Sequence, residues 1–186
     1  MNVLKFIESF TNDNLMNAAG SRRDSFGQFG NLGKNMALAS IPFGLAAMSN
    51  KSFAADINPT PNTPVGALQL ALTLEYLEDE FYQLGLQSGV IPTGGRDEKV
   101  FMQIAQHEAD HVDFLIAGLG ANSIPKPTFD FTVGGAFDPF NATGIGAAAA
   151  YQQFLALAQA FEDTGVRAYK GQAGNLISTP DLLTAA

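Results

Sequence analysis

The stretch LEYLEDEFY at residues 74–82 decides how this chain is expected to fold. With a helical advance of about 100° per residue, its leucines and its phenylalanine fall on one apolar arc. Glu75, Glu78 and Tyr82 fall inside that arc, whereas the two acidic residues that follow Glu78 fall on the opposite side. The pattern therefore predicts a helix that carries carboxylates on the face that should be buried.

Local start and stop signals bound this helix and the next one. Thr63 followed by Pro64 reads as an N-cap with proline at the first helical position, so a helix is expected over 64–87, with a stop at Gly89. A second helix is expected over 97–119, because Gly120 is a typical C-terminal stop.

A long connection and a third helix follow. Residues 121–143 read as an irregular segment that crosses from one end of a bundle to the other, with its phenylalanines covering the core. The third helix is expected over 144–170, ended by Gly171 and Gly174. The threonine and proline at 179–180 repeat the helix-start signature, so the chain is expected to hold the start of a fourth helix.

Both later helices also place a glutamate on their apolar arcs. Glu108 lies near the centre of the second arc, with His111 inside it and His107 at its boundary. Glu162 lies within the apolar arc of the third helix. Each of the three expected helices therefore carries a glutamate on the face that should be buried.

A buried ionised carboxylate costs several kcal/mol unless it is compensated, and the basic residues of these helices lie on polar faces. Shared protons or a bound cation are the remaining ways to compensate these carboxylates. Several carboxylates with one imidazole suit iron or manganese, and Glu108 and His111 have the i, i+3 spacing of di-metal carboxylate bundles. Taken singly, each residue also fits a paired or solvent-reaching carboxylate or a core histidine. The combination favours a metal site.

A repeat relates the first and third helices. Glu75 and Tyr82 are seven residues apart, as are Glu162 and Tyr169, and both pairs project from apolar arcs at nearly the same angle. This predicts a two-fold pseudo-symmetric bundle. The tyrosines either hydrogen-bond the carboxylates or fill the core, and the need of a buried hydroxyl for a partner favours the hydrogen bond.

Three segments together resemble a known family. Residues 74–82, 108–115 and 161–169 are similar to helices of the bacterial ferritin-like domain proteins, which are related to plant desiccation-related proteins. The resemblance covers residues 63–186. It implies an all-α, ferritin-like four-helix bundle that holds two iron or manganese ions, with three helices and the start of the fourth present in this chain.

The resemblance also implies roles for individual residues. Glu75 would be a terminal ligand, Glu108 would bridge the two metals, His111 would bind one of them, and Glu162 would come from the third helix. The residues expected beside these ligands are Glu78, Tyr82, His107 and Tyr169. The family's last helix, with a second E-x-x-H, would lie beyond Ala186. A homo-oligomer or a partner subunit is therefore expected to cover the open bundle face.

The leading interpretation is a di-iron or di-manganese protein that reacts with dioxygen or peroxide. Ferroxidase, peroxidase and catalase-like outcomes all stay open, and so does the question of whether the protein is an enzyme. The alternative is a non-catalytic ferritin-like bundle that serves as a structural or partner-binding subunit of an exported assembly. Metal storage is a third possibility, which requires a closed shell.

Composition narrows the function classes. The 186 residues fit one domain, and 18 acidic against 10 basic side chains give a net charge of −8, the opposite of a nucleic-acid footprint. The absence of cysteine excludes disulfides, thiol catalysis and cysteine-based metal sites. No apolar run is long enough to predict a membrane-spanning helix.

The charge is uneven along the chain. Residues 1–54 hold five basic and three acidic side chains, whereas the rest hold five and fifteen. The pair Arg22-Arg23, the apolar stretch 36–48 and the small residues at 52–54 resemble a twin-arginine export signal.

Three regions are therefore expected. Residues 1–54 form an export signal or an N-terminal arm, 55–63 a linker and 64–186 the ferritin-like domain. The mature chain would start near Ala55 and lie outside the cytoplasm, in the periplasm or cell envelope.

Overall fold

The computed structural model describes residues 62–180 and Leu182. The expected export signal or N-terminal arm, and nearly all of the linker, lie outside these residues.

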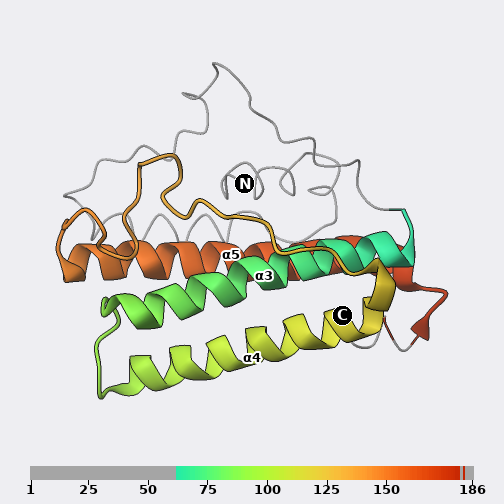
Figure 1. Cartoon of the computed structure of the whole chain (residues 1–186), viewed down its shortest axis with the longest axis horizontal. Helices are drawn as coiled ribbons and strands as arrows, with labels where there is room; N and C mark the ends of the chain where they lie inside the picture. The colour runs from blue at the N-terminus through green and yellow to red at the C-terminus, as the bar shows by residue number, and fades with distance from the viewer. Residues whose placement is uncertain (1–61, 181, 183–186) are drawn as a thin grey trace, which may run out of the picture. The chain divides into compact units, whose positions relative to one another are not determined.

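Three long α-helices make up most of the described chain (Figure 1). Their bounds are Pro64–Ser88 for α3, Arg96–Leu119 for α4 and Ala147–Leu176 for α5, with a short 3₁₀ turn, η1, at Gly120–Asn122. α3 packs against both α4 and α5, whereas α4 and α5 meet mainly near their first turns, where Phe101 contacts Phe154 and the Tyr151 hydroxyl donates to Asp97. α4 and α5 run in the same direction and α3 in the opposite one. The prediction of an all-α fold with packed helices is confirmed.

The described helices show whether any of them could span a membrane. None of them combines the length and the apolar character that crossing a bilayer requires.

The ends of α3 and α4 lie within one residue of their predicted positions. The Thr63 side chain accepts a hydrogen bond from the backbone N–H of Gly66 at 3.1 Å, and Gly89 closes α3 in the left-handed conformation with φ 75°. At the start of α4 the Glu98 carboxylate accepts a hydrogen bond from the N–H of Gly94 at 2.7 Å. These signals act within their own helix ends, so they can be recognised from the sequence alone.

The bounds of α5 differ from the prediction at its start. The helix begins at Ala147 rather than at Gly144, because Gly144 and Gly146 have φ values of 81° and 99°. Such values lie outside the helical region, and glycine adopts them at little cost.

The end of α5 was also predicted wrongly. The helix continues through Gly171 and Gly174 and ends at Leu176. Each glycine costs about 0.5–1 kcal/mol relative to alanine within a helix. Gln172 and Leu176 are both buried, so the packed face of α5 extends past the two glycines and offsets this cost.

A helical segment begins after α5, where the sequence predicts one. Pro180 and Leu182 have helical geometry, and the N–H of Leu182 donates to the carbonyl of Thr179 at 3.0 Å. The Thr179 hydroxyl donates to the carbonyl of Leu176 at 2.9 Å, which ties this start to the end of α5.

The core is built around the Phe81 ring, which stacks on Phe154 with 4.6 Å between centroids. From the long connection, Phe129 and Phe131 are buried and pack into the same cluster, as predicted. α3 and α5 approach closely at Gly85, where an added Cβ would lie 2.2 Å from the Phe154 ring.

Candidate metal centre

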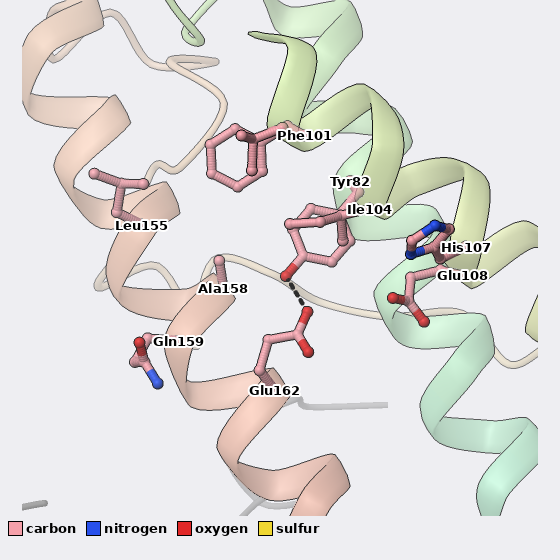
Figure 2. A pocket seen from close by; sticks show the side chains of 10 residues that line it. Tyr82, Phe101, Ile104, His107, Glu108, Leu155, Ala158, Gln159 and Glu162 are labelled. Carbon is pink, nitrogen blue, oxygen red and sulfur yellow. Dashed lines mark hydrogen bonds between the residues drawn. The ribbon is translucent and has the colours of Figure 1, made fainter. Parts of the chain in front are cut away.

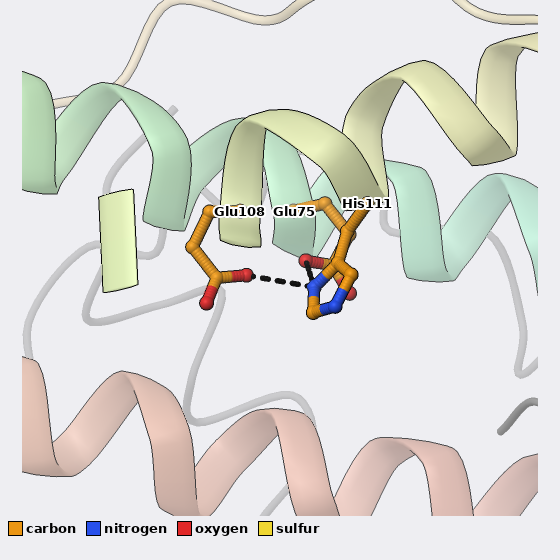
Figure 3. A group of neighbouring side chains, drawn as sticks. All are labelled: Glu75, Glu108 and His111. Carbon is orange, nitrogen blue, oxygen red and sulfur yellow. Dashed lines mark hydrogen bonds and ion pairs between the residues drawn. The ribbon is translucent and has the colours of Figure 1, made fainter. Parts of the chain in front are cut away.

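Two glutamates and one histidine meet where α3 faces α4 (Figure 3). Glu75, Glu108 and His111 each offer a ligand atom, and these atoms all lie within 4.8 Å of one another. His111 Nδ1 lies 3.1 Å from Glu75 Oε2 and 3.1 Å from Glu108 Oε2. Both carboxylates therefore converge on His111 Nδ1, although a single ring N–H can donate to only one of them at a time. We call these three residues the candidate metal centre.

The centre is buried on its carboxylate side and open at its imidazole. Glu75 and Glu108 are 5% and 7% exposed, as the helical arcs predicted. The His111 side chain is 56% exposed, so its predicted place on a buried face was wrong. α4 packs mainly against α3, and among the described residues no helix covers the side of α4 that carries His111.

Burial governs the electrostatics of the carboxyl groups. Burial, followed by a hydrogen bond and charge repulsion with Glu75, raises the pKa of Glu108 to about 9. Burial, followed by repulsion from Glu75 and the other nearby glutamates, raises the pKa of Glu78 well above its ordinary value. Carboxylates held together out of water need protons or a cation to offset their charge.

Lysine does not fill this role in the described part of the chain. The lysine–carboxylate pair found there joins Lys126 to Glu80 at 3.0 Å, on the outer side of α3. The candidate metal centre therefore has no lysine as a compensating charge within the described residues.

Two tyrosines form reciprocal hydrogen bonds between α3 and α5. The Tyr82 hydroxyl of α3 donates to Glu162 Oε1 of α5 at 2.6 Å. The Tyr169 hydroxyl of α5 donates to Glu75 Oε1 of α3. Burial is the main cause that raises the pKa of each tyrosine, and both stay protonated donors. Of the two alternatives left open by the sequence, the hydrogen bond is confirmed.

Glu162 lies apart from the three residues of the centre. It is exposed rather than buried, because the side of α5 that carries it faces α4 without packing against it. Glu162 lines a pocket between α4 and α5, together with Glu108 and the exposed His107 (Figure 2). The role of Glu162 as a ligand stays a prediction.

Glu78 lies one turn from Glu75 on the buried face of α3 and contacts α5. Its Oε1 lies 3.5 Å from the point where a Cβ on Gly165 of α5 would sit, so the carboxyl group packs directly against α5 at this glycine. Sequence reasoning missed Gly165. The repeat contains the signal, since Glu78 follows Glu75 by three residues, as Gly165 follows Glu162.

Comparison with known proteins agrees with this geometry. The family model for the ferritin-like domain matches residues 63–186. The chain belongs to the ferritin-like domain family. Neither the comparison with curated proteins nor that with solved structures gives a match. This ferritin-like domain thus has a group of two glutamates and one histidine that could hold a metal ion.

The donor set of the ferritin-like domain fits a transition metal. Carboxylate oxygens with one imidazole nitrogen suit iron and manganese, and also zinc, better than copper(I) or a cluster that needs thiolates. The spacing of Glu108 and His111 on α4 matches the one that ferritin-like carboxylate proteins use.

Proposed function

We propose that this ferritin-like domain binds iron or manganese at the candidate metal centre and reacts there with dioxygen or peroxide. The observation that carries the proposal is the convergence of Glu75, Glu108 and His111 from two helices within a ferritin-like domain. A bound cation would offset the charge of the buried carboxylates, which protons otherwise offset.

A pair of ions is the form of the site that we favour. Glu108 belongs to the candidate metal centre and also lines the pocket where Glu162 lies. A carboxylate with one oxygen on each side is suited to bridge two ions, and Glu162 would then serve the second one.

The chain's own residues would orient the ligands and control access. The hydrogen bonds from Tyr169 and Tyr82 fix one oxygen of Glu75 and one of Glu162, which leaves the other oxygen of each for a cation. The phenylalanine core shields the carboxylate side from water, whereas the exposed His111 edge admits a small oxidant. Iron or manganese, when bound, would supply the electrons for reduction of an O–O bond.

Metal analysis of the full-length chain tests the proposal. The chain is stripped with a chelator, reloaded with Fe²⁺ or Mn²⁺ without oxygen, desalted and measured by elemental analysis. Glu108→Ala and His111→Ala should lose the metal. Asp110→Ala and Asp113→Ala are matched controls on the exposed side of α4 and should keep most of it. A wild-type chain that retains no transition metal would overturn the proposal.

One observation favours the second candidate function, a non-catalytic bundle that binds a partner. Large apolar side chains are exposed on α4 and α5, with Phe114 58% and Val166 51% exposed. Exposed apolar surface of this kind is typical of interfaces. A chain that forms a stable complex and takes up no metal would support this function over the first.

A further inference from the structure

Glu78 differs from the other buried glutamates of the site in having no partner. Glu75 and Glu108 both face His111. Glu75 also accepts a hydrogen bond from Tyr169. Glu78 is only 4% exposed, yet within the described residues no hydrogen bond or ion pair holds its carboxyl group. Buried polar groups are normally paired, so the missing partner of Glu78 needs an explanation.

The repeat between α3 and α5 places Glu78 between the two halves of the site. It equates Glu75 with Glu162, so Glu78 is equivalent to Gly165, three residues further along each helix. The two reciprocal tyrosine hydrogen bonds follow the same pseudo-symmetry. Glu78 contacts α5 at Gly165, and two equivalent positions that touch lie beside the pseudo-two-fold axis. Glu78 therefore lies between the two equivalent glutamates.

The charges that act on Glu78 come from all three helices. Burial, followed by repulsion from Glu75, Glu162 and Glu108 in that order, raises the pKa of Glu78 well above its ordinary value. None of these neighbours is cationic, and the described lysine–carboxylate pair lies on the outer side of α3, at Glu80. Protons offset the charge of the carboxylates in the free protein, and a bound cation would replace them.

The first ion of the proposed pair has its ligands without Glu78. Glu75, Glu108 and His111 already offer three ligand atoms within 4.8 Å of one another, and Glu78 is not among them. The second ion would have only Glu108 and Glu162 from the proposed ligands. Glu78 contacts α5 at a glycine one turn from Glu162, so it lies toward the half of the site where a further ligand is needed.

The Glu78 carboxyl group is also free to turn toward an ion. A glutamate side chain rotates about several bonds, and its carboxylate offers two oxygens as ligands. One oxygen of Glu75 and one of Glu162 are held by tyrosine hydroxyls. No such bond has to break before Glu78 moves onto a cation, so an ion would draw in Glu78 at a lower cost than a carboxylate that is already hydrogen-bonded.

We propose that Glu78 is a further metal ligand, which binds the second ion of the proposed pair together with Glu108 and Glu162. This set takes one carboxylate from each of the three long helices and contains no imidazole. Oxygen-only sets suit Mn²⁺, whereas imidazole also suits iron and zinc. The inference rests on the proposed function and deepens it, because it makes the two ions unequal, one beside His111 and the other held by carboxylates.

Titration of the full-length chain with Mn²⁺ tests this role. The chain is stripped with a chelator and titrated without oxygen, and electron paramagnetic resonance measures the free and the bound ion. Wild type should bind a pair of ions, close enough to couple magnetically. Glu78→Gln should keep the first ion and bind the second more weakly by roughly 10-fold or more, since even an indirect partner of a ligand typically contributes this much. The variant should then show the signal of an isolated Mn²⁺.

Glu80→Gln is the matched control. It makes the same substitution on the outer side of α3, where Glu80 pairs with Lys126, and it should keep both ions. Glu78→Asp separates a ligand from a nearby charge, because it keeps the charge and withdraws the oxygens by one methylene. A ligand role predicts a weaker second ion in Glu78→Asp as well, whereas a purely electrostatic role predicts no change. If Glu78→Gln fails to fold, Glu78→Asp decides the question.

The outcomes separate this inference from the proposed function. Equally tight binding of the second ion by wild type and Glu78→Gln or Glu78→Asp would overturn the inference and leave the metal function standing. Equal weakening in Glu80→Gln and Glu78→Gln would do the same. So would a single ion in wild type, because Glu78 would then have no second ion to bind. Retention of neither Mn²⁺ nor Fe²⁺ by wild type would overturn the proposed function itself.

Discussion

The hydroxyl of Tyr169 on α5 donates a hydrogen bond to Glu75 on α3, which is one of the residues of the candidate metal centre. α5 contacts α4 near the first turns of both helices, at Phe154 and Tyr151, and its hydrogen bond to the centre runs to α3. Tyr82 makes the reverse connection, from α3 to Glu162 on α5. The orientation of each of these carboxylates therefore depends on a hydroxyl from the neighbouring helix.

Tyr169→Phe should weaken metal binding by about 10- to 100-fold, because partners that orient a ligand typically contribute this much. The ring stays, and only the oxygen that holds Glu75 is removed. Metal titration of the stripped full-length chain measures the effect. Tyr151→Phe is the control on the same helix, since its hydroxyl donates to Asp97 outside the site. Equal affinities for Tyr169→Phe and wild type would show that Tyr169 does not position Glu75.

Glu108→Gln should abolish metal binding without lowering the stability of the stripped protein. Burial and repulsion by Glu75 disfavour a charge on Glu108, and a neutral amide of the same shape removes that cost. Chemical denaturation of chelator-treated wild type and variant gives the comparison. A clear loss of stability in the variant would mean that the Glu108 carboxyl supports the fold rather than a ligand.

Asp138→Ala should destabilise the protein at pH 7, and the difference from wild type should shrink in acid. Asp138 accepts hydrogen bonds from the N–H of Ala142 and from the N–H and hydroxyl of Thr143, at 2.6, 2.8 and 2.6 Å. These bonds, with the Thr143 hydroxyl as the largest cause, hold the pKa of Asp138 below its ordinary value of 3.8.

The direction of this pH dependence follows from the lowered pKa of Asp138. The stabilisation is complete above the pKa that Asp138 has in the unfolded chain, and it is lost as the pH falls through the lower folded-state value. Thermal melts between pH 7 and the acid limit of the folded state check this. Asp113→Ala, at an exposed position of α4, is the control. A constant difference between Asp138→Ala and wild type at all pH values would contradict the prediction.

Gly85→Ala should destabilise the protein by about 1–3 kcal/mol, the usual cost of overpacking a tight contact. The added Cβ would lie 2.2 Å from the Phe154 ring, so α3 and α5 would have to move apart. Gly118→Ala on α4 meets nothing within 4 Å and should instead stabilise the protein by about 0.4–1 kcal/mol. Urea denaturation of both variants measures the two shifts. Shifts of the same sign would contradict the close approach at Gly85.

The sequence predicted those features of the fold that depend on local signals. The threonine cap and the closing glycine bound α3, because each acts on the hydrogen bonds of its own helix end. The continuation of α5 through Gly171 and Gly174 was not predictable in this way, since it depends on burial of Gln172 by other elements.

The same distinction between local signals and helix packing explains which residues of the candidate site were predicted correctly. Glu75 and Glu108 could be assigned to buried faces because α3 and α4 pack against each other there. The helical arcs predicted that His111 and Glu162 are buried, whereas both are exposed. A helical wheel does not show whether a neighbouring helix covers each side. Sequence spacing identified the residue types of the centre, and helix packing determined which of them meet.

The position of α3 between α4 and α5 has a consequence for amide hydrogen exchange. Because α3 packs against both α4 and α5, we expect it to lose its cover only when both of these helices have opened. Within the described residues, the backbone amides in the middle of α3 should therefore exchange with solvent only through the largest opening of the domain. Those of α4 and α5 should exchange through smaller openings, one helix at a time.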